Sequence, residues 1–192
     1  MSWSLAVGRV ASGVFLVRLL PQPIRLARTG VVAGVSPLAA LNSVVTALAW
    51  TAYGATARLA VVAIVSALAV IPSAWTALLL VRSATRSDWL GALAWSGVVV
   101  AAAVTGRLGF VLAGSVLLTI GPQVIVALRG TDLRGIAPAT MWIALAHASL
   151  WGLYGLVLED GALMAYGLVL SSSATIVLVR IATTQRLSPV IA

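Results

Sequence analysis

Residues 21–54 read PQPIRLARTGVVAGVSPLAALNSVVTALAWTAYG, and residues 122–155 read PQVIVALRGTDLRGIAPATMWIALAHASLWGLYG. The two stretches lie 101 positions apart and align without a gap, with ten identities in 34 positions. The identities include prolines and glycines, which fix backbone geometry that other residues tolerate poorly. The chain is therefore internally duplicated, and a duplication in an apolar chain predicts a pathway built where two halves meet.

The composition predicts an integral membrane protein. The chain is 61% hydrophobic and 8% charged, whereas a soluble domain carries roughly 25% charged residues. Helices are expected because each one satisfies its own backbone hydrogen bonds in hydrocarbon. The strands of a membrane barrel would alternate polar and apolar residues, and the apolar runs of this chain do not alternate.

The net charge of +8 comes from twelve arginines and no lysine. These arginines are scattered among apolar runs, which does not fit a nucleic-acid-binding face. The chain has no cysteine, which excludes disulfides and thiolate metal sites. No nucleophile–base pair, phosphate-binding loop or metal-ligand cluster is recognisable. We therefore expect neither a cofactor nor a metal, and we do not expect an enzyme.

Seven apolar runs approach the length of about 20 residues that a helix needs to cross a bilayer. The first run contains two arginines and is the least regular. The predicted spans are 3–24, 37–54, 59–81, 89–105, 108–128, 138–158 and 161–179.

The arginines predict the orientation through the positive-inside rule. With the N-terminus outside, only Arg58 and Arg107 fall in outer segments. The inner segments then carry Arg25, Arg28, Arg82, Arg86, Arg129, Arg134, Arg180 and Arg186. The prediction is a multi-pass protein of the plasma membrane, with its N-terminus outside and its C-terminus in the cytoplasm.

The span count also predicts the domain organisation. A three-helix unit that starts outside ends inside, so a second copy in the same orientation needs one extra crossing first. The predicted arrangement is a first triple-helix repeat at 1–84, a linker helix at 85–106 and a second repeat at 107–192. The fold class is all-α integral membrane, with two parallel triple-helix bundles and a linker (3+1+3).

These features together resemble the PQ-loop superfamily and, within it, the SWEET and SemiSWEET sugar transporters. A Pro-Gln pair closes the first helix of each triplet, and Trp-x-x-Tyr-Gly follows at the same distance in both repeats. The second repeat carries the resemblance best, in Gly121-Pro-Gln, Asp132-Leu-Arg-Gly-Ile-Ala-Pro138, Leu150-Trp-Gly-Leu-Tyr-Gly155 and Glu159-Asp160.

The resemblance implies a central solute site to which each repeat contributes a tryptophan from its second helix, here Trp50 and Trp151. It also implies an asparagine from each third helix, but this chain has Ser66 and Gly167 there. Packing of neighbouring helices would explain such small residues as well, and a widened cavity is the alternative. The competing interpretation of the tryptophans is an aromatic belt at the membrane interface.

Three further residues are candidates for the solute pathway. Thr46 and His147 are equivalent in the two repeats and lie one helical turn from the tryptophans. A buried neutral histidine bonded to a helix carbonyl is the structural alternative to a pathway role. Arg18 lies inside the first span with no acid in any span to pair with. It must snorkel to the inner interface or line the cavity, which would favour an anionic solute.

The resemblance further implies gates on both sides of the membrane. The inner hinge would consist of Pro21, Gln22, Pro37, Pro122, Gln123 and Pro138, although a proline at position 37 or 138 could simply begin a helix. The outer gate would consist of Tyr53, Arg58, Tyr154, Glu159 and Asp160, and two solvated loops are the alternative.

The sequence therefore predicts a facilitative, alternating-access carrier of a small solute, with a mono- or disaccharide as the leading class. An anionic or amphipathic metabolite is one alternative, and a non-transporting receptor or scaffold is another. The expected partners are the lipid bilayer and the solute, and no nucleic acid. The sequence leaves a homo-oligomer open.

Overall fold

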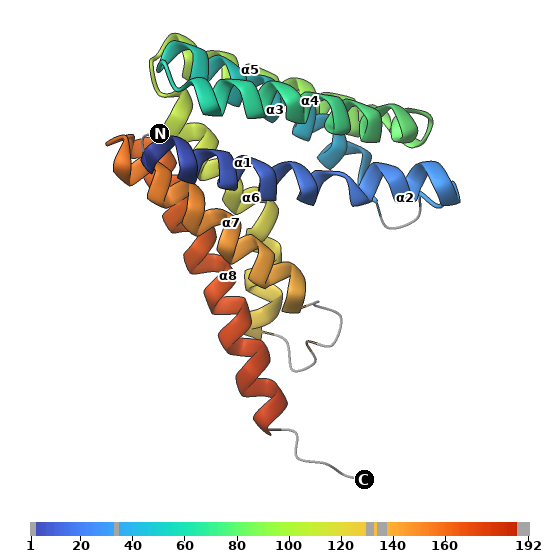
Figure 1. Cartoon of the computed structure of the whole chain (residues 1–192). Helices are drawn as coiled ribbons and strands as arrows, with labels where there is room; N and C mark the ends of the chain where they lie inside the picture. The colour runs from blue at the N-terminus through green and yellow to red at the C-terminus, as the bar shows by residue number, and fades with distance from the viewer. Residues whose placement is uncertain (1–2, 33–34, 130–132, 134–137, 188–192) are drawn as a thin grey trace. The chain divides into compact units, whose positions relative to one another are not determined.

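The computed structural model describes residues 3–32, 35–129, 133 and 138–187, and the regular secondary structure of these residues is helical (Figure 1). The predicted all-helical fold is confirmed. The elements are α1 (Trp3–Leu19), α2 (Pro21–Thr29), α3 (Pro37–Thr56), α4 (Ala60–Leu80), the short 3₁₀ helix η1 (Val81–Ser83), α5 (Arg86–Val104), α6 (Leu108–Arg129), α7 (Pro138–Val157) and α8 (Gly161–Leu187).

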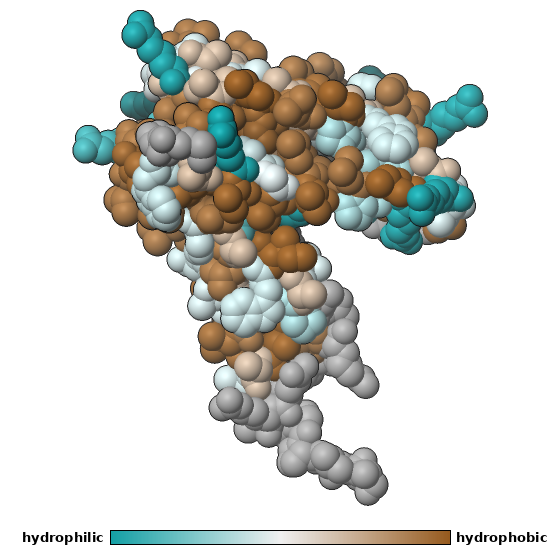
Figure 2. Space-filling model, in the orientation of Figure 1, coloured by the Kyte–Doolittle hydropathy of each residue, from teal (hydrophilic) through white to brown (hydrophobic). Residues whose placement is uncertain are grey.

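The described helices match the predicted membrane spans. Six segments are long and apolar enough to cross a bilayer, with α1 and α2 counted together as Trp3–Thr29. α6 supplies a seventh span when its two parts, Leu108–Leu118 and Gln123–Arg129, are taken together across a bend of 42°. On the face shown in Figure 2, strongly hydrophilic side chains lie mostly at or near helix ends, while apolar side chains cover much of the flanks.

Some helix boundaries differ from the predicted spans for identifiable reasons. α5 begins at Arg86 because Thr85 and Asp88 form a capping box, in which the Thr85 backbone N–H donates to Asp88 Oδ2 at 2.7 Å. α8 extends to Leu187, beyond the predicted end at residue 179. Hydropathy marks where a chain is apolar, whereas a helix continues for as long as its backbone hydrogen bonds are satisfied.

The helices group into two compact units, Met1–Leu112 and Ala113–Ala192, called here the N-terminal and C-terminal units. The N-terminal unit holds the first repeat, α5 and the first turns of α6. The C-terminal unit holds the rest of α6 with α7 and α8. Each unit has buried apolar clusters of its own.

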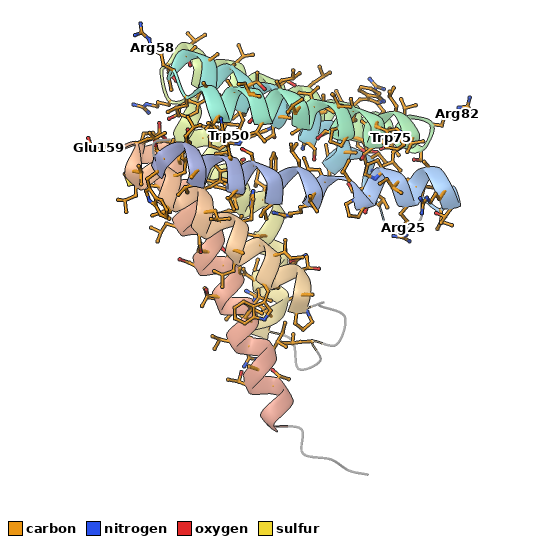
Figure 3. All side chains as sticks on the ribbon, viewed as in Figure 1. Arg25, Trp50, Arg58, Trp75, Arg82 and Glu159 are labelled. Atoms are coloured by element: carbon orange, nitrogen blue, oxygen red, sulfur yellow. The ribbon has the colours of Figure 1, made fainter. Side chains whose placement is uncertain are left out.

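In the N-terminal unit, α4 packs against both α1 and α3, and α5 packs on α3. A buried cluster of Leu26, Ala40 and Leu80 joins α2, α3 and α4. Arg25 and Arg82 lie at one end of this unit and Arg58 lies at the other (Figure 3). The arginines assigned to opposite sides of the membrane are thus at opposite ends of the helices.

In the C-terminal unit, α7 and α8 form a close pair that also packs on α6. Val116 and Ile120 of α6 meet Ala148 of α7 and Leu170 of α8 in one buried cluster. A second cluster contains Ala127 of α6, Met141 of α7, Val177 and Ile181 of α8, and Leu133. All three helices of the second repeat therefore share one core.

Candidate functional site

A tryptophan–tyrosine pair occurs in the same geometry in both repeats. Trp50 and Tyr53 of α3 stand edge to face, with ring centroids 5.6 Å apart and planes at 84°. Trp151 and Tyr154 of α7 do the same at 5.7 Å and 80°. Such edge-to-face pairs contribute about 0.5–1.5 kcal/mol beyond the area they bury. The duplication seen in the sequence thus extends to side-chain conformation.

Exposure separates the two duplicated tryptophans and Trp95 from the other four tryptophans of the chain. Trp151 is 5% exposed, and Trp50 and Trp95 are partly buried. The other four are exposed by 40% or more and lie toward helix ends or in terminal turns, where an interfacial belt is expected: Trp3, Trp75, Trp89 and Trp142. The exposed four fit the belt, whereas the two duplicated indoles are packed within the protein.

The residues one turn before the duplicated tryptophans have different neighbours. Thr46 Oγ1 accepts a hydrogen bond of 3.1 Å from the indole N–H of Trp95 in α5. His147 is 1% exposed, and its ring stands edge-on to Tyr166 of α8 with centroids 6.0 Å apart. Equivalent positions are therefore held by the linker helix in the first repeat and by the repeat's own third helix in the second.

Ser66 and Gly167 are both buried in the third helices of their repeats. A Cβ added at Gly167 would collide with the backbone of Gly152 and would lie 2.9 Å from the carbonyl oxygen of Ala148. The close approach of α7 and α8 fills this position. The expected widening of a cavity at Gly167 is therefore not observed, and the packing alternative describes this residue.

The Pro-Gln pairs coincide with a break between α1 and α2 in the first repeat and with a bend in α6 in the second. α1 ends at Leu19 and α2 begins at Pro21, and the parts of α6 meet at 42° just before Gln123. Proline lacks the N–H that would bond to the carbonyl four residues earlier, so the helix is weakened there. Pro37 and Pro138, in contrast, begin α3 and α7, where proline removes no helical hydrogen bond.

The α3–α4 and α7–α8 hairpins share one backbone conformation. Arg58 and Glu159 have φ values of 58° and 56°, and they are the only non-glycine residues with positive φ in the described part of the chain. The following residues close the same turn, from Leu59 N–H to the Gly54 carbonyl at 2.7 Å and from Asp160 N–H to the Gly155 carbonyl at 2.8 Å.

The linker hairpin shows that this turn does not need a charged residue. Gly106 has a φ of 69°, and Arg107 N–H donates to the Ala102 carbonyl at 2.8 Å in the same pattern. Glycine is the usual residue at this left-handed position, which costs other residues about 1–2 kcal/mol. Oppositely charged residues replace it only in the two repeat hairpins, which points to a use for their side chains.

Two further predicted residues have structural positions that narrow their roles. Asp160 Oδ1 accepts the backbone N–H of Leu163 at 2.8 Å and so caps α8. Arg18 is exposed on the last turn of α1. Glu159 is consequently the better candidate than Asp160 for the outer gate.

Three residues with a structural role were not among the candidates chosen from the sequence. Trp95 lies in the middle of α5, away from the ends where belt tryptophans occur, and this position was the available signal. Pro72 interrupts α4 from inside and is visible as a proline within an apolar run. Arg180 Nε donates to the Ala127 carbonyl at 3.0 Å near the end of α6, which no sequence pattern indicates.

The described helices define a polytopic membrane protein built on a duplicated three-helix unit. Comparison of the sequence with protein-family models and with curated proteins finds no match. Among solved structures, the chain is similar to a eukaryotic SWEET transporter with a TM-score of 0.73 and 17% sequence identity, over 95% of this chain and 97% of that one. The chain has the SWEET-like fold, and the resemblance inferred from the sequence is confirmed at the level of the fold.

Proposed function

We propose that this chain is a membrane transporter that moves a small neutral solute, a mono- or disaccharide, by facilitative alternating access. The observation that carries the proposal is the duplicated Trp–Tyr pair within a SWEET-like fold. An indole offers a flat apolar face to a sugar ring and one hydrogen-bond donor, which suits weak binding of a neutral ligand. Trp50 and Trp151 would contact the solute, with Thr46, Ser66 and His147 nearby on the same or the neighbouring helix.

Counterflow in liposomes containing the purified chain tests this function. The panel sets neutral mono- and disaccharides beside organic anions and amphipathic metabolites. Saturable exchange of a sugar supports the proposal. Exchange confined to the anions or amphipathic compounds would show that the solute is not a sugar. If no solute is exchanged, a receptor or scaffold on a transporter fold is favoured.

A less polar or amphipathic solute is the second candidate. Ser66 and Gly167 replace two amides with one hydroxyl and no side chain, and both positions are buried. An amide offers two donors and an acceptor, so the replacement removes most of the hydrogen-bonding capacity at these positions. An anionic solute receives less support, because Arg18 is exposed on the last turn of α1.

We propose that the inner hinge lies at the two Pro-Gln pairs. The break before Pro21 and the bend before Gln123 place a weakened helical segment at the same point of each repeat. Pro37 and Pro138 would then only set where α3 and α7 begin. A hinge at one point in each repeat allows the inner ends of both first helices to move during transport.

The outer gate is proposed to include Arg58 and Glu159 with the adjacent Tyr53 and Tyr154. We expect Arg58→Glu to lower counterflow severalfold, because it places two like charges at equivalent hairpins. Combining it with Glu159→Arg should restore most of the flux, because the opposite charges are restored in exchanged positions. The measurement is counterflow at low ionic strength, where exposed charges are least screened. A double variant as slow as the single one would argue against an interaction of the two charges.

The proposed orientation places the Arg58 end of the N-terminal unit outside and the Arg25 and Arg82 end in the cytoplasm. The natural chain contains no cysteine, so single cysteines can be introduced on a clean background. We expect a membrane-impermeant maleimide to label Ala57→Cys in intact cells, and Ser83→Cys only after permeabilisation. Labelling in the reverse order would invert the topology.

A further inference from the structure

The hydrogen bond between Trp95 and Thr46 joins the linker helix to the turn of α3 that carries Trp50. The Trp95 indole N–H donates to Thr46 Oγ1 at 3.1 Å, and both side chains are partly buried. Thr46 lies four residues before Trp50, which is about one helical turn. The linker helix therefore reaches the segment from which the proposed solute-binding indole projects.

Apolar packing places the same helix against Trp50 itself. Trp50, Tyr53 and Trp95 all pack on one cluster, which consists of Ala49, Val99, Ala102, Leu108 and Leu112. Two of its members, Val99 and Ala102, belong to α5. Trp50 thus packs on a cluster that includes residues of the linker helix. Thr46, one turn before Trp50, is hydrogen-bonded to the same helix.

α3 and α5 also meet closely at their other ends, where a Cβ added at Gly91 would lie 2.8 Å from Leu38 Cδ1. The seam between the two helices therefore runs from Leu38 through Thr46 to Ala49. Apolar packing alone tolerates small sliding of one helix along another. A hydrogen bond within the seam has one preferred geometry and so opposes that sliding.

At the equivalent position of the second repeat, the described ring contact lies within the repeat. The residue equivalent to Thr46 is His147, whose ring stands edge-on to Tyr166 of α8 at 86°. α8 belongs to the same repeat as His147, whereas α5 belongs to neither repeat. A ring contact of the turn before Trp151 thus lies within its repeat, whereas the turn before Trp50 is hydrogen-bonded to the linker helix.

We propose that Trp95 is a positioning residue, through which the linker helix sets the place of the Trp50 indole by way of Thr46. The linker then does more than return the chain across the membrane for a second copy of the repeat. The effect on solute binding rests on the proposed function. The hydrogen bond between Trp95 and Thr46, called here the tie, does not depend on that function.

Amide hydrogen exchange of the full chain in lipid nanodiscs tests the tie without any solute. Trp95→Phe keeps an aromatic ring but removes the N–H donor, and Thr46→Val keeps the shape of the side chain but removes the acceptor. We expect each change to speed exchange of residues 47–53 by roughly 3- to 15-fold, the range for loss of one hydrogen bond between membrane helices. The double variant should exchange no faster than either single variant, because both changes remove the same bond.

Two controls belong to this measurement. Trp89→Phe changes an exposed tryptophan of the same helix and should leave exchange unaltered, and residues 148–154 of the second repeat should be unaffected in every variant. Unchanged exchange of residues 47–53 in Trp95→Phe would overturn the proposal. Additive effects in the double variant would do the same, since they would show that the two side chains act independently.

Counterflow separates positioning from a general structural role. For the solute that the chain carries, Trp95→Phe should raise KM by a similar factor with a smaller change in maximal rate, and Trp89→Phe, which changes an exposed tryptophan of the same helix, should remain close to the natural chain. An unchanged KM in Trp95→Phe would refute the link to Trp50. A chain that exchanges no solute would refute the proposed function, while hydrogen exchange would still decide the tie.

Discussion

Gly167→Asn is expected to disrupt folding of the C-terminal unit, although the resemblance to SWEET transporters places an asparagine at this position. The Cβ alone would collide with the backbone of Gly152 and would approach the Ala148 carbonyl within 2.9 Å. Overpacking costs about 1–3 kcal/mol even where side chains can shift. Here the obstructing atoms are backbone atoms of a neighbouring helix, so we expect a loss of roughly 3 kcal/mol or more.

Thermal unfolding in detergent, followed by size-exclusion chromatography, measures this effect. Gly114→Ala is the matched control in the same unit, because a Cβ at Gly114 meets nothing within 4 Å. Alanine has the higher helix propensity by about 1 kcal/mol, so the control should be as stable as the natural chain or slightly more so. A monodisperse Gly167→Asn protein with an unchanged unfolding temperature would show that α7 and α8 are farther apart than described.

Trp50→Phe and Trp151→Phe should each lower the apparent affinity for the transported solute by about 30-fold, as expected for a central aromatic contact residue that contributes about 2 kcal/mol. Phenylalanine keeps a ring that can face Tyr53 or Tyr154, but it loses the indole donor and part of the flat surface. The two changes should have similar effects because the two pairs have nearly the same geometry, 5.6 Å and 84° against 5.7 Å and 80°.

The assay is the concentration dependence of counterflow, combined with thermal unfolding to confirm that each variant is folded. Trp142→Phe is the control, because it lies on α7 with Trp151 but is 60% exposed. Its KM should remain that of the natural chain. Folded Trp50→Phe and Trp151→Phe proteins with an unchanged KM would remove both indoles from the solute site.

The membrane spans could be predicted from the sequence because hydropathy and proline act locally. The starts of α3 and α7 coincide with the predicted starts at Pro37 and Pro138, and α6 begins at the predicted residue 108. A proline at the first helical position needs no distant partner to have its effect. The end of α8 at Leu187 could not be predicted in the same way, because the helix continues beyond the apolar run that hydropathy marks.

The candidate site was predictable as a set of residues but not as a set of contacts. The duplication identified both tryptophans and the charged hairpin residues, since equivalent positions are visible in one sequence. For each candidate residue, a role in the solute pathway and a purely structural role differ in which neighbours the side chain contacts. The packing of Gly167 on Gly152 and the bond from Trp95 to Thr46 depend on the distance between helices, which periodicity does not contain.

The sequence by itself determined that the chain is a helical membrane protein with a repeated three-helix unit, because apolar length, arginine placement and matched prolines are properties of the chain alone. Only the tertiary structure decided that Gly167 fills a helix contact and that Arg58 and Glu159 share a strained left-handed conformation. It also decided that the linker helix holds the turn below Trp50. These features arise from the approach of segments far apart in sequence and from turn geometry that charged residues seldom adopt.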